Sequence, residues 1–445
     1  MLNLNKKLQI QKKRYLDQKA IYKNYNPIFH IIRYAVGLFF IIICYLISPL
    51  LLVRFGSVRT RTFGDMCREI NDSIFFGSNV NKKCLDLRYF YVKYPGAISN
   101  TYLYSFLQSK FIFLPAYILS PVLFWAKKYK FLNQHMLPHM CGRTISIRPG
   151  FKKVSKLESD KYFRSSGLKT LMPDYELRAN HLLKSLALED KKLIGIHVRD
   201  SEWQKQNMNY LSHYPEFQRI FHAIHKFESN SVLRNSSLLN FLDAIRLLDK
   251  QNYTCIRFGN PSKIYPKNII DPLIDFGNSE FSNNENDILL MGKMRYLICS
   301  VSGMSLLAHW MRVPIFLIDI VDLYATEAIY ATINSHPIIL PKEIRWKRNN
   351  KLLTKEEIKS LELFKLPSEK VRQKIVQNES EVYVLENSPS VIQKTISLGH
   401  KYVTTNEIDK DVECGKLIYQ SIYGSESYEL SPILSPYWPN SYEKV

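Results

Sequence analysis

The chain has 445 residues, of which 46% are apolar and only 16 are glycine. This composition excludes disordered, collagen-like and small disulfide-stapled proteins and predicts two or three domains. The chain carries 61 Lys and Arg against 40 Asp and Glu, a formal net charge of +21. Such an excess suits nucleic-acid binding, but no zinc-finger, RRM or basic-zipper pattern accompanies it, so we expect no nucleic-acid partner.

Residues 34–55 give the strongest local signal. No charged residue lies between Arg33 and Arg54, and about twenty apolar residues suffice to cross a bilayer. We therefore expect a membrane anchor helix over 34–55, preceded by a basic cytoplasmic arm over 1–33 that favours anionic headgroups. The run starts too late for a signal peptide. Pro49 would break the helix, so a simple span and a re-entrant or in-plane anchor both stay open.

A second apolar stretch covers residues 111–126 and contains Pro115 and Pro121. Its length and its prolines favour a strand over 111–114 followed by a proline-started helix, rather than a second span. A crossing at this point would return the C-terminal part of the chain to the cytosol.

The cysteines and the glycosylation sequons say little about function. Seven cysteines are scattered without a C-x-x-C pair. This pattern fits neither a disulfide framework nor a zinc site, and it favours a reducing compartment. Sequons occur at Asn71, Asn235, Asn252 and Asn378, but an Asn-rich chain of this length contains such a number by chance.

Strand and helix patterns alternate from residue 192 onward, as in a parallel sheet with helices on both faces. Before that point the pattern is weaker, with strands over 83–91 and 111–114 and an amphipathic helix over 175–189. We expect a first α/β domain over 56–185, a second over 190–400, and a polar tail over 401–445. The expected elements of the second domain are strands over 193–198, 253–258, 295–301 and 313–318, and helices over 236–250, 287–294 and 304–311.

The candidate binding residues follow the predicted strands, because ligands of such sheets bind at the carboxyl ends of strands. Two guanidiniums can bind a phosphate bidentately, and a helix N-terminus offers backbone N–H groups to an anion. Alone, the His-x-Arg-Asp run is equally well explained by a structural ion pair, and Arg257 and the Ser302-Gly303 turn are better explained by structural roles. Their joint position at successive strand ends predicts a diphosphate site formed by His197, Arg199, Asp200, Arg257, Gly259, Ser302 and Gly303.

The stretch Ile194–Asp200, IGIHVRD, resembles the strand and His-x-Arg core of the fucosyltransferase-like GT-B superfamily. Further stretches resemble a group of bacterial glycosyltransferases associated with surface-polysaccharide loci. The resemblance covers residues 56–360 and is firm from residue 193 onward. The matching stretches are Arg234–Ser237, Asn240–Ile245, Ile256–Gly259, Asp287 with Ser302–Met304, and Lys351–Ile358.

This resemblance implies a GT-B fold, in which two Rossmann-like α/β domains face each other across a cleft and the second holds a nucleotide-sugar donor. By position, Arg199 would hold the donor diphosphate beside His197, and Asp287 would support the neighbouring loop. The other donor-binding positions would be Arg257, Gly259, Ser302 and Gly303. Asp200 stands where many members carry a second basic residue, which leaves the donor open.

The first domain resembles the superfamily less closely. Residues 61–65 occupy the place where relatives show a Gly-His pair that faces the acceptor, so Asp65 or Glu69 is the candidate general base. The expected reaction moves a sugar to a hydroxyl of a polysaccharide or lipid-linked glycan, at the cytoplasmic face of the bacterial inner membrane. Fixed cations would stabilise the leaving diphosphate without a metal or a cofactor. The resemblance implies inversion at the sugar carbon.

Two other functions stay open from the sequence. One is a type II membrane fucosyltransferase with a lumenal catalytic domain, which glycan occupancy at Asn235 or Asn252 would indicate. The other is a non-catalytic, membrane-tethered scaffold that binds a nucleotide without transferring a sugar.

Overall fold

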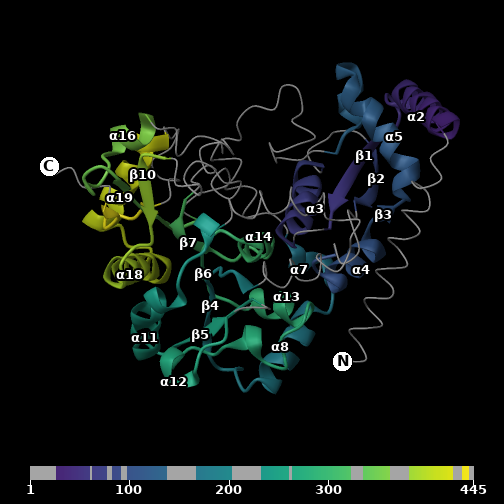
Figure 1. Ribbon diagram of the computed structural model, residues 1–445. Helices are drawn as coiled ribbons and strands as arrows, with labels where there is room; N and C mark the ends of the chain where they lie inside the picture. The colour runs from purple at the N-terminus through teal and green to yellow at the C-terminus, as the bar shows by residue number, and fades with distance from the viewer. Residues whose placement is uncertain are drawn as a thin grey trace. The chain divides into compact units, whose positions relative to one another are not determined.

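The computed structural model describes residues 27–60, 63–77, 83–91, 98–137, 167–202, 232–259, 263–321, 334–360, 380–423 and 433–439. The chain divides into two compact units, Met1–Lys153 and Val154–Val445. Figure 1 shows that strands and helices alternate in both. The expected α/β class is confirmed.

The first unit is built on a three-stranded parallel sheet in the order β1-β2-β3. β1 and β2 pair over their whole length, from Leu52 opposite Cys84 to Arg59 opposite Tyr91. The strands are β1 (Leu52–Arg59), β2 (Cys84–Tyr91) and β3 (Ile112–Phe113). The helices are α2 (Pro27–Ile47), α3 (Phe63–Gly77), α4 (Thr101–Lys110), α5 (Ala116–Lys128) and the 3-10 helix η1 (Lys130–His135).

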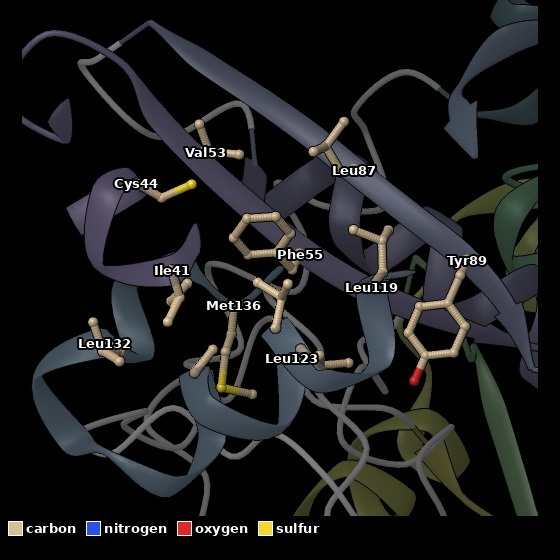
Figure 2. Packing of buried hydrophobic residues seen from close by; sticks show 12 residues of the cluster. Ile41, Cys44, Val53, Phe55, Leu87, Tyr89, Leu119, Leu123, Leu132 and Met136 are labelled. Carbon is tan, nitrogen blue, oxygen red and sulfur yellow. The ribbon is translucent and has the colours of Figure 1, made fainter. Parts of the chain in front are cut away.

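The core of the first unit joins α2 and α5 to the sheet. Figure 2 shows the side chains that α2, β1, β2 and α5 contribute to this cluster. Phe55 of β1 is 1% exposed and Ile41 of α2 is fully buried. Because the exposed fractions are this low, burial of these apolar side chains stabilises the unit, at about 25 cal/mol per Å² removed from water.

The prediction of one helix over 34–55 is wrong. α2 ends at Ile47, a turn follows, and β1 begins at Leu52. Pro49 cannot donate a backbone hydrogen bond, which ends the helix, and the next residues find backbone partners in β2 instead. The shorter predicted elements are confirmed. The strand expected over 83–91 is β2, the strand expected over 111–114 is β3, and the helix expected after it is α5.

Within the part of the chain that the structure describes, no helix combines the length and the apolar character that crossing a bilayer requires.

The second unit contains a six-stranded parallel sheet in the order β11-β8-β7-β6-β4-β5. A separate antiparallel pair joins β9 to β10. The strands are β4 (Lys192–His197), β5 (Tyr253–Arg257), β6 (Leu297–Cys299), β7 (Ile315–Ile320), β8 (Ile338–Pro341), β9 (Glu343–Trp346), β10 (Val382–Leu385) and β11 (Ile433–Leu434). The α-helices are α7 (Leu168–Leu171), α8 (Tyr175–Ser185), α11 (Leu242–Lys250), α12 (Lys267–Ile270), α13 (Asn286–Met291), α14 (Gly303–Trp310), α16 (Lys355–Ser360), α18 (Pro389–Thr405) and α19 (Lys410–Tyr423).

The four strands predicted for the second domain are confirmed as β4, β5, β6 and β7. The predicted helices over 287–294 and 304–311 correspond to α13 and α14, while the one over 236–250 starts with a 3-10 turn, η4 (Leu238–Phe241), and continues as α11. β4 to β7 are almost fully buried on both faces, which explains why their sequences are continuous apolar runs.

The structure divides the chain differently from the expected ranges 56–185, 190–400 and 401–445. The division falls after Lys153. α8 belongs to the second unit, where the Tyr175 hydroxyl donates to the Leu289 carbonyl at 2.9 Å. The expected tail is also part of this unit, because β11 pairs with β8 and Trp438 donates to the Lys342 carbonyl at 3.1 Å.

Candidate functional site

The strand order of the second unit creates a topological switch point between β4 and β6. From β4 the chain moves to β5 on one side, and it then crosses back to β6 and β7 on the other side. In open α/β sheets, ligands bind in the crevice outside the carboxyl ends of strands at such a point. The residues at this place are those that follow β4 and β6, and they include Arg199 and Ser300.

Backbone hydrogen bonds fix Arg199 at the switch point. Its amide donates to the Ser300 hydroxyl at 2.8 Å, and its carbonyl accepts from the Ser236 amide at 3.0 Å. The Arg234 guanidinium donates to the Val301 carbonyl at 2.7 Å. The end of β4, the end of β6 and the segment before α11 are therefore tied together around Arg199.

Ser302 and Gly303 begin α14 directly after β6. The Ser302 hydroxyl accepts from the Met304 amide at 3.2 Å, and the Ser305 hydroxyl donates to the Ser302 carbonyl at 2.6 Å. Ser302 is thus the N-cap of the helix, and the positive end of the helix dipole lies at the carboxyl edge of the sheet. That Ser302 and Gly303 bind a phosphate directly stays a prediction.

His197 ends β4 and bridges to the strand beside it. Its Nδ1 lies 3.1 Å from the Phe258 carbonyl oxygen. Because a carbonyl can only accept, Nδ1 carries the proton and Nε2 is left as an acceptor. Burial lowers the pKa of His197 to about 4, so the imidazole is neutral at physiological pH and adds no positive charge to the site.

Arg257 lies in a buried ion-pair network. Its side chain is 1% exposed and contacts Asp275 at 3.1 Å and Asp200 at 3.4 Å. It also donates to the Lys263 carbonyl at 2.8 Å, and Asp200 accepts from the Lys263 amide at 2.7 Å. Two carboxylates therefore balance the Arg257 charge. A direct bond from Arg257 to a diphosphate stays a prediction.

Gly259 follows this network in a conformation that favours glycine, with φ of 115°. A Cβ added at Gly277 would lie 2.3 Å from the Gly259 carbonyl oxygen. The chain after β5 and the turn at 276–278 approach this closely because Gly277 has no Cβ. Gly259 therefore shapes the loop at the end of β5, and its contact with a donor stays a prediction.

Asp287 lies in the first turn of α13, on the connection from β5 back to β6. Burial raises the pKa of its carboxyl to about 7, while a hydrogen bond with Ser282 opposes the shift. The position supports the loop that precedes α13, since the Asp287 amide donates to the Asn283 carbonyl at 3.0 Å. A carboxyl with this pKa is partly protonated near neutral pH.

The two candidate bases of the first unit, Asp65 and Glu69, both lie in α3. Glu69 of α3 is buried and accepts from the backbone amide of Arg59 at 2.6 Å and from its guanidinium at 2.5 Å. This ion pair ties α3 to the end of β1. Asp65 is in α3, but its side chain lies outside the described residues, as do residues 61–62. The role of either residue as a base stays a prediction.

The structure adds three buried polar residues that the sequence did not single out: Asp319 at the end of β7, Lys342 after β8 and Asn387 after β10. The Lys342 ammonium donates at 2.6 Å to the carbonyl of Asn235, the residue next to Ser236, which contacts Arg199. Asn387 donates to Asp319 at 2.6 Å.

These residues carry the marks of a strained, buried polar site. Asp319 adopts a φ of 55°, in the left-handed region that residues other than glycine seldom adopt. Burial lowers the pKa of Lys342, and nearby Asp319 opposes the shift. Applying the strand-end rule to the apolar run at 338–341 would have found Lys342, but that run was not recognised as a strand.

No group of three or more His, Cys, Asp or Glu side chains that could hold a metal ion occurs among the described residues.

Comparison with known proteins gives weak similarities. No protein-family model matches the sequence, and no curated protein matches it. The crystal structure of a family 9 glycosyl transferase from Veillonella parvula is 12% identical, with a TM-score of 0.39 over 79% of this chain and 97% of that one. The ADP-heptose LPS heptosyltransferase II of E. coli is 10% identical, with a TM-score of 0.31 over 60% of this chain and 84% of that one. Likeness at these scores establishes neither a shared fold nor a shared activity.

Proposed function

We propose that the chain is a glycosyltransferase that moves a sugar from a nucleotide-diphosphate donor to a glycan hydroxyl. One observation carries the proposal: Arg199 is fixed at the switch point of the six-stranded parallel sheet by hydrogen bonds to Ser300 and Ser236. A permanently charged guanidinium at that place suits an anionic ligand. The sequence resemblance of residues 194–200 supports the same site.

The proposed donor site combines Arg199, the N-terminal end of α14 and Lys342. Breaking the bond between the sugar and the diphosphate leaves negative charge on the diphosphate, and cations already in place stabilise that charge most. Arg257 then acts as a positioning residue, because its bonds to Asp200 and Asp275 hold the loop after β5. The Nε2 atom of the neutral His197 can accept a hydrogen bond from a hydroxyl of the nucleotide-sugar.

We place the acceptor in the first unit, with Asp65 or Glu69 as the base that removes the hydroxyl proton, and we expect inversion without a metal ion or cofactor. The two units would form a GT-B enzyme. The acceptor would be a polysaccharide or lipid-linked glycan at the cytoplasmic face of a bacterial inner membrane, with lipids and no nucleic acid as further partners.

Two sequons differ in how well they can test the lumenal fucosyltransferase. Asn71 is 3% exposed, so a glycan there would have to displace packed structure. Asn252, in an exposed turn, is the described sequon at which the lumenal alternative can be tested.

The second candidate is a nucleotide-binding scaffold without transfer activity. The balanced charge of Arg257 favours it, since two carboxylates already occupy a guanidinium that a transferase could use on its leaving group. Binding of a nucleotide without transfer of any sugar would support this candidate.

A donor screen followed by a transfer assay tests the proposal. A ligand at about 100 times its Kd adds roughly 2.7 kcal/mol to the apparent stability, so thermal shift identifies the nucleotide. With the donor identified, Arg199→Ala is expected to lower kcat/KM about 100-fold or more, as for other lost groups that stabilise transition-state charge. Arg246→Ala on exposed α11 is the matched control. Equal turnover in wild type and Arg199→Ala would refute the site.

A further inference from the structure

α2 exposes apolar side chains where a helix on a protein surface normally exposes polar ones. Ile31, Phe39 and Leu46 are 68%, 67% and 68% exposed. Only a narrow stripe, which includes Ile41 and Cys44, faces the core. A surface helix in water typically pairs one apolar stripe with a polar face, whereas the outward arc of α2 is apolar along the helix. Exposed apolar surface of this extent marks an interaction site.

α5 and η1 extend this surface. α2 lies directly against α5, where a Cβ added at Gly37 would be 2.7 Å from the Pro121 Cβ, and Figure 1 shows the two helices side by side. Exposed rings continue from one element to the next. Tyr45 of α2 contacts Phe131 of η1 at a centroid distance of 5.3 Å. We call the exposed apolar side chains of α2, α5 and η1 the α2/α5 face.

Aromatic and basic residues border the α2/α5 face. Trp125 and Tyr129 stack at 5.7 Å, and the Lys128 ammonium lies 4.8 Å from the centroid of the Trp125 ring. Trp and Tyr are enriched where a bilayer meets water, and lysine stems lie along apolar surface while their charges reach water. The exposed Lys128 and Lys130 are thus placed to meet headgroups.

The charge of the surrounding sequence has one sign. No Asp or Glu lies between Asp17 and Asp65, which bracket α2, or between Asp86 and Glu158, which bracket α5. Every charged side chain in these two stretches is Lys or Arg. The α2/α5 face is apolar and the charged residues around it in sequence are all basic. It therefore complements an anionic lipid bilayer, whose acyl chains are apolar and whose headgroups are negatively charged.

We infer that the α2/α5 face docks in the plane of an anionic lipid bilayer, with its apolar side chains among the upper acyl chains and Lys128 and Lys130 at the headgroups. Glu substitutions on this face remove apolar burial and add repulsion. The inference concerns the first unit alone and does not depend on sugar transfer, so either can fail without the other.

Vesicle flotation of the full-length protein tests this inference. Vesicles of phosphatidylcholine alone are compared with vesicles that also contain phosphatidylglycerol. The wild type is expected to float with the anionic vesicles and to bind the neutral ones more weakly. Phe39→Glu and Ile31→Glu are each expected to weaken binding roughly tenfold or more, because burial of one such side chain contributes about that factor. Leu177→Glu is the control, since Leu177 is 74% exposed on α8 of the second unit.

The charge contribution is tested separately. Lys128→Gln with Lys130→Gln is expected to lower the preference for anionic vesicles by about fivefold for each charge, with Lys191→Gln as control. Circular dichroism and the oligomeric mass from light scattering are recorded for each variant. Any of the following results would overturn the inference: vesicle binding unchanged in both Glu variants, equal loss with Leu177→Glu, or a wild-type dimer that the Glu variants dissociate without any change in vesicle binding. Binding that depends on the lysines but not on Phe39 would also overturn it, because any polyanion, including a nucleic acid, would then suffice.

Discussion

The two units differ most in charge. Met1–Lys153 carries 24 Lys and Arg against 5 Asp and Glu, a net charge of +19, whereas Val154–Val445 carries 37 against 35, a net charge of +2. The unit with the candidate anion site is therefore the nearly neutral one. Its charge is local, at Arg199 and Lys342, while the basic excess belongs to the unit with the α2/α5 face. A net charge for the whole chain conceals this division.

Both units pair buried arginines with carboxylates. In the second unit, Arg257 is buried between Asp200 and Asp275. In the first unit, buried Arg54 contacts Asp86 at 2.7 Å. Burial lowers the pKa of Lys127 of α5 to about 8, and nearby Glu69 opposes this shift. The units differ in the supply of acids, because the first has 5 Asp and Glu for 24 Lys and Arg and so keeps a large positive excess.

Removing the balanced cation of the second unit should destabilise that unit strongly. Arg257→Met leaves two carboxylates without their buried partner, and breaking a buried ion pair costs about 3–5 kcal/mol. Hydrogen exchange read peptide by peptide should show lost protection in β4 to β7 and unchanged protection in β1 and β2. Loss spread evenly over both units would show that they do not unfold separately. Arg246→Met, on the exposed surface of α11, serves as the control.

Replacing Gly37 with a larger residue should destabilise the first unit. The added side chain would press against Pro121, since a Cβ would lie 2.7 Å from the Pro121 Cβ. Overpacking of this kind costs about 1–3 kcal/mol, so Gly37→Val should lower protection in α2 and α5. Ala35→Val, at an exposed position of α2, is the matched control. Unchanged exchange in Gly37→Val would mean that α2 does not pack on α5 at this point.

The stability of the first unit should rise with pH above pH 8. The folded state releases the Lys127 proton near pH 8, whereas the unfolded chain holds it to about pH 10.5, the ordinary lysine value. Between these values the unfolded state binds more protons, so raising the pH favours the folded state. Lys127→Met should remove this part of the pH dependence in urea unfolding followed at the first unit. An equal slope in the variant would contradict the shift.

Asp287 should give the second unit the opposite trend over a lower range. Its pKa is raised from 3.8 to about 7, so the folded state holds a proton that the unfolded state releases. The contribution of Asp287 to stability therefore falls as the pH rises from about 4 to 7. The difference in stability between Asp287→Asn and wild type should therefore favour the variant more at pH 8 than at pH 4. A gain that does not depend on pH would indicate a packing effect instead.

Much of the second unit can be predicted from sequence because its strands are buried on both faces. Continuous apolar runs reveal β4 to β7, and the residues that follow them reveal Arg199, Ser302 and the turn into α14. β8 escapes the same reasoning because its four residues follow Pro337 and end in Pro341. β11 has two residues and is recognisable only through its pairing with β8.

The partners of charged residues could not be predicted, because they depend on contacts distant in sequence. Asp275 reaches Arg257 because the segment at Ile274 bridges back to Ile256 of β5, an arrangement that no local pattern reveals. The prediction of a helix over 34–55 was wrong for a related reason. The end of this stretch is as apolar as a membrane helix, but β2 supplies the backbone partners that make it a strand.

Calorimetry of nucleotide binding tests the candidate site most directly. UDP, GDP and ADP are titrated into the full-length wild type, Arg199→Ala and the control Arg246→Ala. We expect one nucleoside diphosphate to bind the wild type and Arg246→Ala equally. We expect Arg199→Ala to bind it roughly tenfold or more weakly, since a hydrogen bond to a charged group contributes about 1.5–3 kcal/mol. Equal affinity in wild type and Arg199→Ala, or no binding of any of the three, would contradict the assignment of an anion site to the switch point between β4 and β6.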